Sequence, residues 1–243
     1  MRHIVKRRHL VIYQSNAHLL ATLLFLVAPF VFLLFFSRIA NIAVADLYSN
    51  VGISLLRLTV AYIISVFIGW ACAVLFYKGR RGAVALPLFD VLQSFPTFAI
   101  LPLATVVLGA GDAIIIFFLI LTILWPVFFS ILSSLRLMKR DWEEAATMAG
   151  WRGFTYLKRF LLPLSIPGLI IGSVIGLGEG WGALIATETI TGTSKGLGSF
   201  FSAYADNSTV TAFGILGLLM LIFSFNKLVW SPLLNWSHRM TEE

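Results

Sequence analysis

Long charge-free apolar blocks alternate with short polar segments along this 243-residue chain. A helix needs about 20 predominantly apolar residues to cross the hydrocarbon core of a bilayer. Helices satisfy their own backbone hydrogen bonds in lipid, so these blocks predict an all-α polytopic membrane protein with six transmembrane helices. The predicted spans are approximately residues 19–36, 58–77, 88–108, 113–135, 160–183 and 209–230.

The composition supports this class. Hydrophobic residues make up 59% of the chain and charged residues 12%, which is about half the ~25% that soluble proteins carry. A transmembrane β-barrel would instead show alternating hydrophobicity over segments of about 10 residues. The single cysteine, Cys72, lies inside an apolar block. An intrachain disulfide and a cysteine-based metal site are therefore excluded.

The basic residues predict the orientation of the spans. Of the 18 Lys and Arg residues, only Arg38, Arg57 and Lys195 fall in one set of alternating connections, and the others fall in the opposite set. Connections rich in Lys and Arg are cytoplasmic, so both termini are predicted to be cytoplasmic. The net charge of +7 is then a topology signal, and we expect no nucleic-acid partner.

The domain organisation is simple. Residues 1–18 form a basic cytoplasmic arm and residues 19–243 a single transmembrane domain. A basic start followed by an apolar run also fits a cleavable signal peptide, but this run exceeds the usual core of about 7–15 residues, so we interpret it as a retained span. An outer loop is predicted over residues 37–50, and a short outer helix around 197–204.

The longest polar interruption, residues 136–163, is predicted to hold two short cytoplasmic helices. Asp141 is a candidate cap of the first helix, and Glu144 lies three residues later, as a capping box requires. Small side chains give this helix a narrow face, and a glycine ends it because glycine adopts left-handed backbone at no steric cost. The small residues of this face are Ala145, Ala146 and Ala149, and the glycine is Gly150.

The second helix of this loop is predicted over residues 154–160, with Pro163 and Pro167 marking the entry to the fifth span. A rigid helix pair would let a docked partner tilt the spans attached to it. The other interpretation is an amphipathic pair lying in the membrane interface, which the aromatic residues Trp142, Trp151 and Tyr156 suit.

The spacing of Glu144-Ala145-Ala146, Gly150 and Leu162-Pro163 resembles the cytoplasmic loop of ABC importer permeases, the binding-protein-dependent transport inner membrane components. Other stretches are similar to the permeases for nitrate, sulfonate, taurine and related anions. The resemblance covers roughly residues 50–235. Its further stretches are Ser54–Arg57, Phe95–Leu103, Trp181–Glu188, Gly196–Gly198 and Asn226–Leu233.

The resemblance implies a type I ABC importer permease fold with cytoplasmic coupling helices, in the inner or plasma membrane of a prokaryote. It implies a non-catalytic subunit that pairs with a second permease copy, ABC ATPase subunits and an extracytoplasmic substrate-binding protein, in contact with membrane lipid. The expected solute is a small anion or organic oxyanion. ATPase coupling is expected of Asp141, Glu144, Ala145, Ala146, Gly150, Leu162 and Pro163.

No nucleotide-binding loop of the Gly-x-x-x-x-Gly-Lys-Ser/Thr type occurs in the chain. ATP and Mg are therefore expected in the partner ATPase, and no cofactor is expected here. A secondary transporter or channel without an ATPase is the alternative, which inverted repeats would support, and we find none. A third alternative, an intramembrane enzyme, would need catalytic side chains on a span. The four histidines lie in or beside the tails instead. We therefore predict no catalytic residue and no metal site.

Polar groups inside predicted spans are costly and mark candidate functional positions. Arg57 either attracts an anion or extends to the outer interface. The acids Glu179 and Glu188 suit an anion path poorly. Four interpretations of these two acids are open. They pair with Arg57 or Lys195, they gate the path, they contact the binding protein, or they indicate that the substrate is not a simple anion. The candidate translocation-path residues are Arg57, Gln93, Ser94, Pro96, Glu179, Trp181 and Glu188.

Three further details bear on the path. A helix broken at Pro96 would expose backbone to a cavity. Gly172, Gly176 and Gly180 form a small-x-x-x-small face that packs either within the chain or at a dimer axis. The chain also departs from the family pattern at Glu179, where a small, apolar or basic residue is expected, and this departure weakens the assignment of a substrate.

Overall fold

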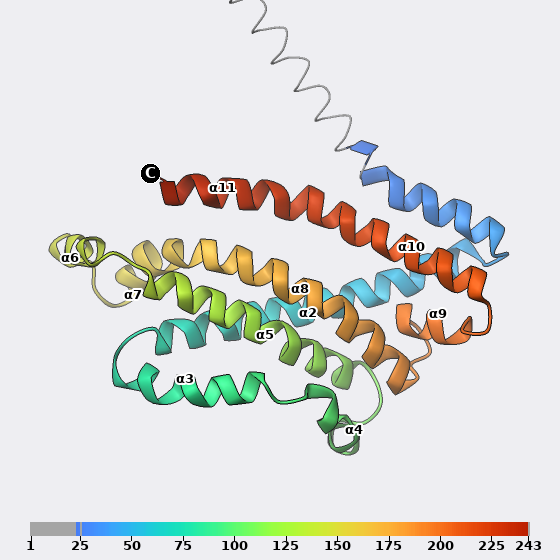
Figure 1. The fold of residues 1–243 in the computed structure, drawn as a ribbon, viewed down its shortest axis with the longest axis horizontal. Coiled ribbons are helices and arrows are strands. Elements are labelled where there is room, and N and C mark those ends of the chain that lie inside the picture. The colour runs from blue at the N-terminus through green and yellow to red at the C-terminus, as the bar shows by residue number, and fades with distance from the viewer. Residues whose placement is uncertain (1–22, 25, 243) are drawn as a thin grey trace, which may run out of the picture. The chain divides into compact units, whose positions relative to one another are not determined.

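The computed structural model describes residues 23–24 and 26–242, and within them every regular element is a helix (Figure 1). The all-α class is thus confirmed for the described part of the chain. The predicted arm, residues 1–18, and the first residues of the predicted span 19–36 lie outside it. Two compact units are present, one of residues 1–48 and 204–233 and one of residues 49–203 and 234–243.

The second unit contains most of the helices. Helix α2 (Val44–Phe76) enters it from the first unit, and α5 and α8 pack side by side along its middle (Figure 1). Its other elements connect or flank these helices. They are α3 (Gly79–Gln93), η1 (Thr97–Ile100), α4 (Leu101–Leu108), α5 (Asp112–Arg136), α6 (Arg140–Met148), α7 (Gly153–Tyr156), η2 (Leu157–Leu161), α8 (Leu162–Thr191) and α9 (Leu197–Ala203).

Glycines decide how closely α5 and α8 approach. A Cβ atom on Gly172 would lie 2.7 Å from the Cα of Val127, and one on Gly176 would lie 3.1 Å from the carbonyl oxygen of Ile123. In lipid, where apolar contact alone gives helices little reason to associate, such close packing supplies van der Waals contact instead. The small-x-x-x-small face therefore packs within the chain, on α5.

Two side-chain hydrogen bonds join α2 to α8. The hydroxyls of Tyr62 and Ser173 lie 2.8 Å apart, and the indole nitrogen of Trp70 donates to Ser165 Oγ at 3.1 Å. Polar contacts of this kind between membrane helices are worth about 0.6 kcal/mol on average. They fix the rotation of α2 on α8 more than they add stability.

The described spans differ from the predicted count. Four helices are long and apolar enough to cross a membrane, or up to five if the bent pair at residues 82–108 is one span. A shorter apolar helix, Leu26–Ile39, covers part of the first predicted span. The predicted outer loop over residues 37–50 is wrong, because α2 already begins at Val44; Asp46 in its first turn suits the positive end of the helix dipole.

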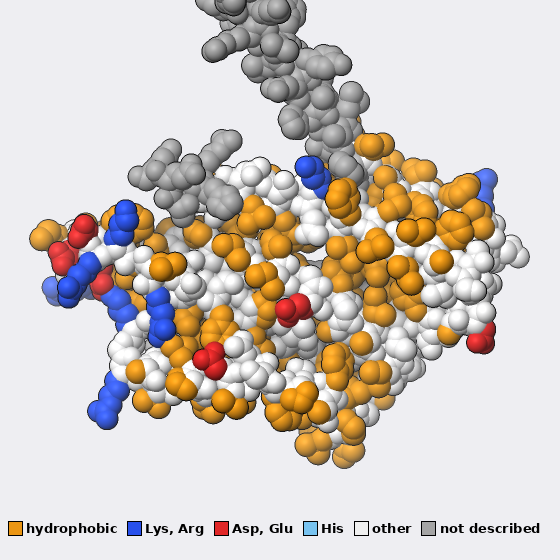
Figure 2. Space-filling model, in the orientation of Figure 1, with side chains coloured by type: hydrophobic (Ala, Val, Ile, Leu, Met, Phe, Trp, Pro, Cys, Tyr) orange, Lys and Arg blue, Asp and Glu red, His pale blue; other side chains and the backbone are white. Residues whose placement is uncertain are grey.

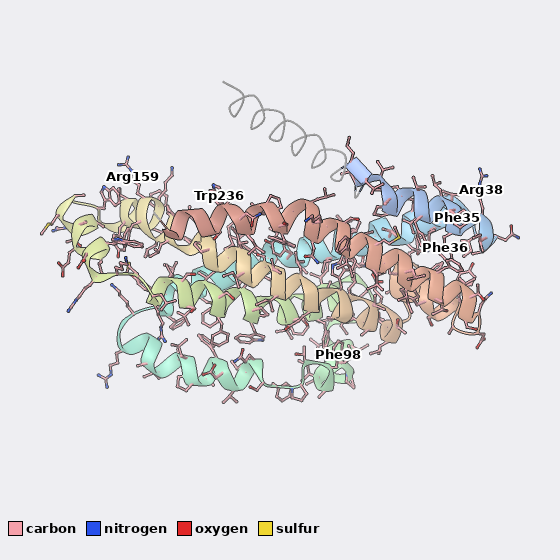
Figure 3. The ribbon with its side chains drawn as sticks, turned by 45° about the horizontal axis from the view of Figure 1, so that its top comes forward. Phe35, Phe36, Arg38, Phe98, Arg159 and Trp236 are labelled. Carbon is pink, nitrogen blue, oxygen red and sulfur yellow. The ribbon has the colours of Figure 1, made fainter. Side chains whose placement is uncertain are left out.

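The third predicted span is broken, as the sequence suggested. Its two halves, Gly82–Gln93 and Thr97–Leu108, meet at an angle of 77°. Pro96 has no backbone N–H and disfavours helical conformation at the residue before it. Phe98, labelled in Figure 3, lies on η1. Its ring stacks on that of Phe118 of α5 with centroids 5.7 Å apart, which fixes the second half against α5.

The first unit pairs helix Leu26–Ile39 with α10 (Ser208–Phe225). Phe36, which Figure 3 shows on the first of these helices, is fully buried and stacks on Phe213 at 6.1 Å. Asn207 caps α10 by accepting a hydrogen bond from the Val210 amide at 3.1 Å. The chain continues through η3 (Asn226–Trp230) into α11 (Ser231–Glu242), so the last span, residues 208–237, is longer than predicted.

Candidate functional site

Helix α6 carries the Glu-Ala-Ala sequence of the predicted coupling loop. Its N-cap is Lys139, which is extended, and no side chain caps its N-terminus. The predicted capping box is therefore wrong: Asp141 lies one residue inside the helix, where its carboxylate can only favour the positive end of the helix dipole. Glu144 follows as an exposed residue of the same short helix.

The end of α6 is built as the sequence predicts. Gly150 has φ +74°, in the left-handed region. The Trp151 amide donates to the carbonyl of Ala146 at 3.1 Å, and the Gly150 amide donates to that of Thr147 at 3.0 Å. This pair of bonds is a Schellman motif, which closes the last turn and sets the direction of the chain beyond it.

The two alanines of the motif face different surroundings. Ala146 is buried, with 3% of its surface exposed, whereas Glu144 and Ala145 are exposed. Two large apolar side chains are also left uncovered, Met148 at 88% and Trp142 at 45% exposure. Figure 2 shows charged side chains of both signs gathered at the end of the molecule where α6 and α7 lie. The exposed side of α6 is therefore a mixed acidic and apolar surface.

An ion pair holds α6 to the rest of its unit. Lys78, at the start of α3, pairs with the carboxylate of Glu143 on α6. Both side chains are partly exposed, so the pair contributes at most about 1 kcal/mol to stability. Its effect is to fix α6 against the connection between α2 and α3. Sequence reasoning missed this contact, because the partners are 65 residues apart and neither belongs to a motif.

The predicted second short helix is not separate. Elements α7, η2 and α8 form one continuous helix, residues 153–191, so the short helix predicted over residues 154–160 is the first part of the fifth span. Pro163 removes one helical hydrogen-bond donor, and the stretch just before it, Leu157–Leu161, is a wider π-helical turn. Such a bulge accommodates a local irregularity without ending a helix.

A buried charge network lies at the opposite end of α8. The Nη1 atom of Arg57 donates to Glu188 Oε1 at 2.6 Å, while its Nη2 atom donates to Asp112 Oδ1 at 2.6 Å. Glu188 is fully buried and Arg57 is 7% exposed. Ser54 Oγ lies 2.8 Å from Glu188 Oε1 and accepts from the Leu197 amide at 2.8 Å. This network ties α2, α5, α8 and α9 together.

Two glycines let the chain close over Glu188. The amide of Gly198 donates to Glu188 Oε2 at 2.9 Å. A Cβ atom on Gly196 would lie 2.5 Å from the carboxyl carbon of Glu188, and one on Gly198 would lie 2.6 Å from its Cβ. Of the predicted possibilities for Glu188, the structure shows pairing with Arg57. Lys195 takes part only through its carbonyl, which accepts from Arg57 at 2.9 Å.

A cavity of about 460 Å³ lies in the same unit, beside the break in the third span. It brings together three of the predicted path residues from α3 and α8, namely Gln93, Ser94 and Glu179. Figure 2 shows isolated acidic side chains among apolar and uncharged ones over this part of the molecule. The remaining lining residues are Thr97, Leu121, Thr122, Trp125, Pro126, Phe129, Ser130 and Ile175.

The other predicted path residues lie elsewhere. Arg57 and Glu188 belong to the buried network, and Trp181 is packed in the core with 6% of its surface exposed. Pro96 shapes the break next to the cavity without lining it. Sequence reasoning missed the wall from α5, including Trp125 and Phe129, because apolar spacing does not show which helix face meets a cavity.

A family model described as "Binding-protein-dependent transport system inner membrane component" matches residues 65–229. The chain belongs to this family. The match includes α6, the broken third span and the cavity, and it confirms the resemblance found in the sequence. As a member of this family with several apolar helices, the chain is a multi-pass membrane protein.

Three curated relatives share the matched region. The nitrate import permease protein of Leptolyngbya laminosa is 28% identical over 182 residues, which are 72% of this chain and 65% of the relative. The bicarbonate transport system permease protein of Synechococcus elongatus is 28% identical over 69% and 63% of the two chains. The taurine transport system permease protein of Escherichia coli is 30% identical over 63% and 56%. This chain thus covers less than two thirds of each relative.

Proposed function

We propose that this chain is the membrane-spanning subunit of an ATP-driven ABC importer, with α6 as the docking helix for a separate ATPase. The observation that carries the proposal is the exposed side of α6, where Glu144, Ala145 and Met148 are uncovered although Ala146 of the same helix is buried. A small exposed Ala lets a partner approach closely, Met148 offers apolar contact, and Glu144 offers a charge to a basic side chain.

The contacts that hold α6 in place support the transmission of force from this helix to the membrane helices. Ala146 is buried beneath it, Lys78 holds its side at Glu143, and the Schellman turn at Gly150 sets its direction. Beyond that turn the chain enters the continuous helix 153–191. A push on α6 would therefore reach α8 through the four residues between Met148 and Gly153, and a rigid-body tilt of packed helices is a common form of such switching.

The proposed path runs beside the broken third span, where helix ends and uncovered backbone meet a cavity, as in other transport proteins. We assign both chain termini to the cytoplasm from the distribution of basic residues. A second copy of the subunit would complete the path, and an extracytoplasmic binding protein would deliver the solute. ATP and Mg would be held by the ATPase. The names of the relatives favour a small anion or organic oxyanion.

Copurification of the tagged full chain tests the ATPase partnership. We expect the wild type to retain an ATPase subunit in detergent, and Glu144→Gln together with Met148→Glu to lose most of it. Asp206→Asn, an exposed acid outside α6, is the matched control and should retain the ATPase. A wild-type chain that moves solute in vesicles with no ATPase bound would instead establish the alternative, a secondary transporter or channel.

A further inference from the structure

Glu179 is the one charged side chain among the residues that line the cavity. Among the residues that the structure describes, its carboxylate has no hydrogen-bond or ion-pair partner. Glu188, nine residues further along α8, is in contrast fully paired. These nine residues correspond to about 13 Å of helix, and the guanidinium of Arg57 is already bound by Glu188 and Asp112. The cavity therefore carries an uncompensated negative charge.

Two of the four hydroxyl groups that line the cavity present acceptors to it. Ser94 donates its hydroxyl hydrogen to the Asp90 carbonyl at 2.8 Å, and Thr122 donates its own to the Phe118 carbonyl at 3.0 Å. A hydroxyl that has donated its single hydrogen retains only acceptor lone pairs. An anion needs donors, so these two oxygens suit a ligand that brings N–H groups.

Two more features of the lining point the same way. An amide hydrogen of Gln93 is donated to the Asp90 carboxylate at 3.2 Å, which leaves the Gln93 oxygen as an acceptor and places a second acid close by. The rings of Trp125 and Phe129 also line the cavity. Aromatic faces attract ammonium groups and do not attract small anions.

We propose that this cavity binds the protonated amino group of the transported solute, with Glu179 as its counter-ion. The solute class is then a zwitterion such as an aminosulfonate, an organic oxyanion that also carries an ammonium group. A simple inorganic anion would leave the carboxylate of Glu179 unpaired. This inference rests on the proposed function for its transport role, although the binding site itself is defined by the cavity alone. Glu179 is exposed and lines the cavity, and an ammonium ligand would give its carboxylate a partner.

Ligand titration of the purified full chain in lipid nanodiscs tests the proposal. The probes are ethylammonium, taurine, ethanesulfonate and nitrate, and the readout is tryptophan fluorescence compared with that of the Trp125→Phe variant. We expect ethylammonium and taurine to bind about tenfold or more tightly than ethanesulfonate and nitrate. Glu179→Gln should weaken ethylammonium by about tenfold, the scale of one charge-assisted hydrogen bond. Asp206→Asn should bind like the wild type.

The proposal is overturned if nitrate or ethanesulfonate binds as tightly as ethylammonium. It is also overturned if Glu179→Gln binds ethylammonium as the wild type does, or if ethylammonium fails to bind at about 50 mM. Circular dichroism and retention of the ATPase by Glu179→Gln show that this variant is folded. Loss of the ATPase from the wild type would refute the proposed importer and leave the cavity measurement intact, so the two failures are distinguishable.

Discussion

Removing Arg57 should destabilise this protein far more than removing the charge of Asp112, its exposed acidic partner. Arg57→Met leaves the fully buried carboxylate of Glu188 without its counter-ion, with only the hydroxyl of Ser54 and the amide of Gly198 to solvate it. Breaking a buried pair from one side costs about 3–5 kcal/mol in soluble proteins. Asp112 is 69% exposed, so Asp112→Asn should cost less than about 1 kcal/mol.

The double variant Arg57→Met with Glu188→Gln separates the cost of an unpaired buried charge from the cost of losing the Arg57 side chain. Because it leaves no uncompensated charge, it should be more stable than Arg57→Met alone. The free energy of unfolding is measured by denaturation of the purified chain with sodium dodecyl sulfate in mixed micelles, followed by tryptophan fluorescence. The reasoning is refuted if Arg57→Met lies within about 1 kcal/mol of the wild type, or if Asp112→Asn costs as much as Arg57→Met.

Three further substitutions test particular contacts. Gly172→Ala should cost about 1–3 kcal/mol in the same denaturation assay, because its Cβ meets backbone atoms of α5, whereas Gly178→Ala, with nothing within 4 Å, should be neutral. Gly150→Ala should lower the stability by about 1 kcal/mol through its left-handed backbone and reduce ATPase retention in copurification. Lys78→Met should change stability by less than about 1 kcal/mol. It should nevertheless raise the number of ATP molecules hydrolysed per solute molecule moved in vesicles. An unchanged ratio would contradict the proposal that the Lys78–Glu143 pair holds α6 in place for coupling.

Local chemistry explains which parts of the fold could be predicted. The break at Pro96 and the turn at Gly150 depend on the backbone preferences of single residues, and both appear where the sequence placed them. The start of α2 and the continuity of the helix over residues 153–191 were missed. Helices extend beyond their apolar blocks where polar residues also form helix, and a π-helical turn absorbs a proline without any signal in the apolar pattern.

The sequence by itself determined the class of this protein, its apolar helices and the Glu-Ala-Ala helix, because these features follow from hydrophobicity, local conformation and short spacing. Only the tertiary structure decided that Glu188 is paired with Arg57 and that Glu179 faces a cavity unpaired. Both acids lie on one helix and look alike in the sequence. One acid is paired and the other is not because different neighbouring helices pack against the two positions on α8. This packing joins segments that are distant in the sequence, so local sequence patterns do not reveal it.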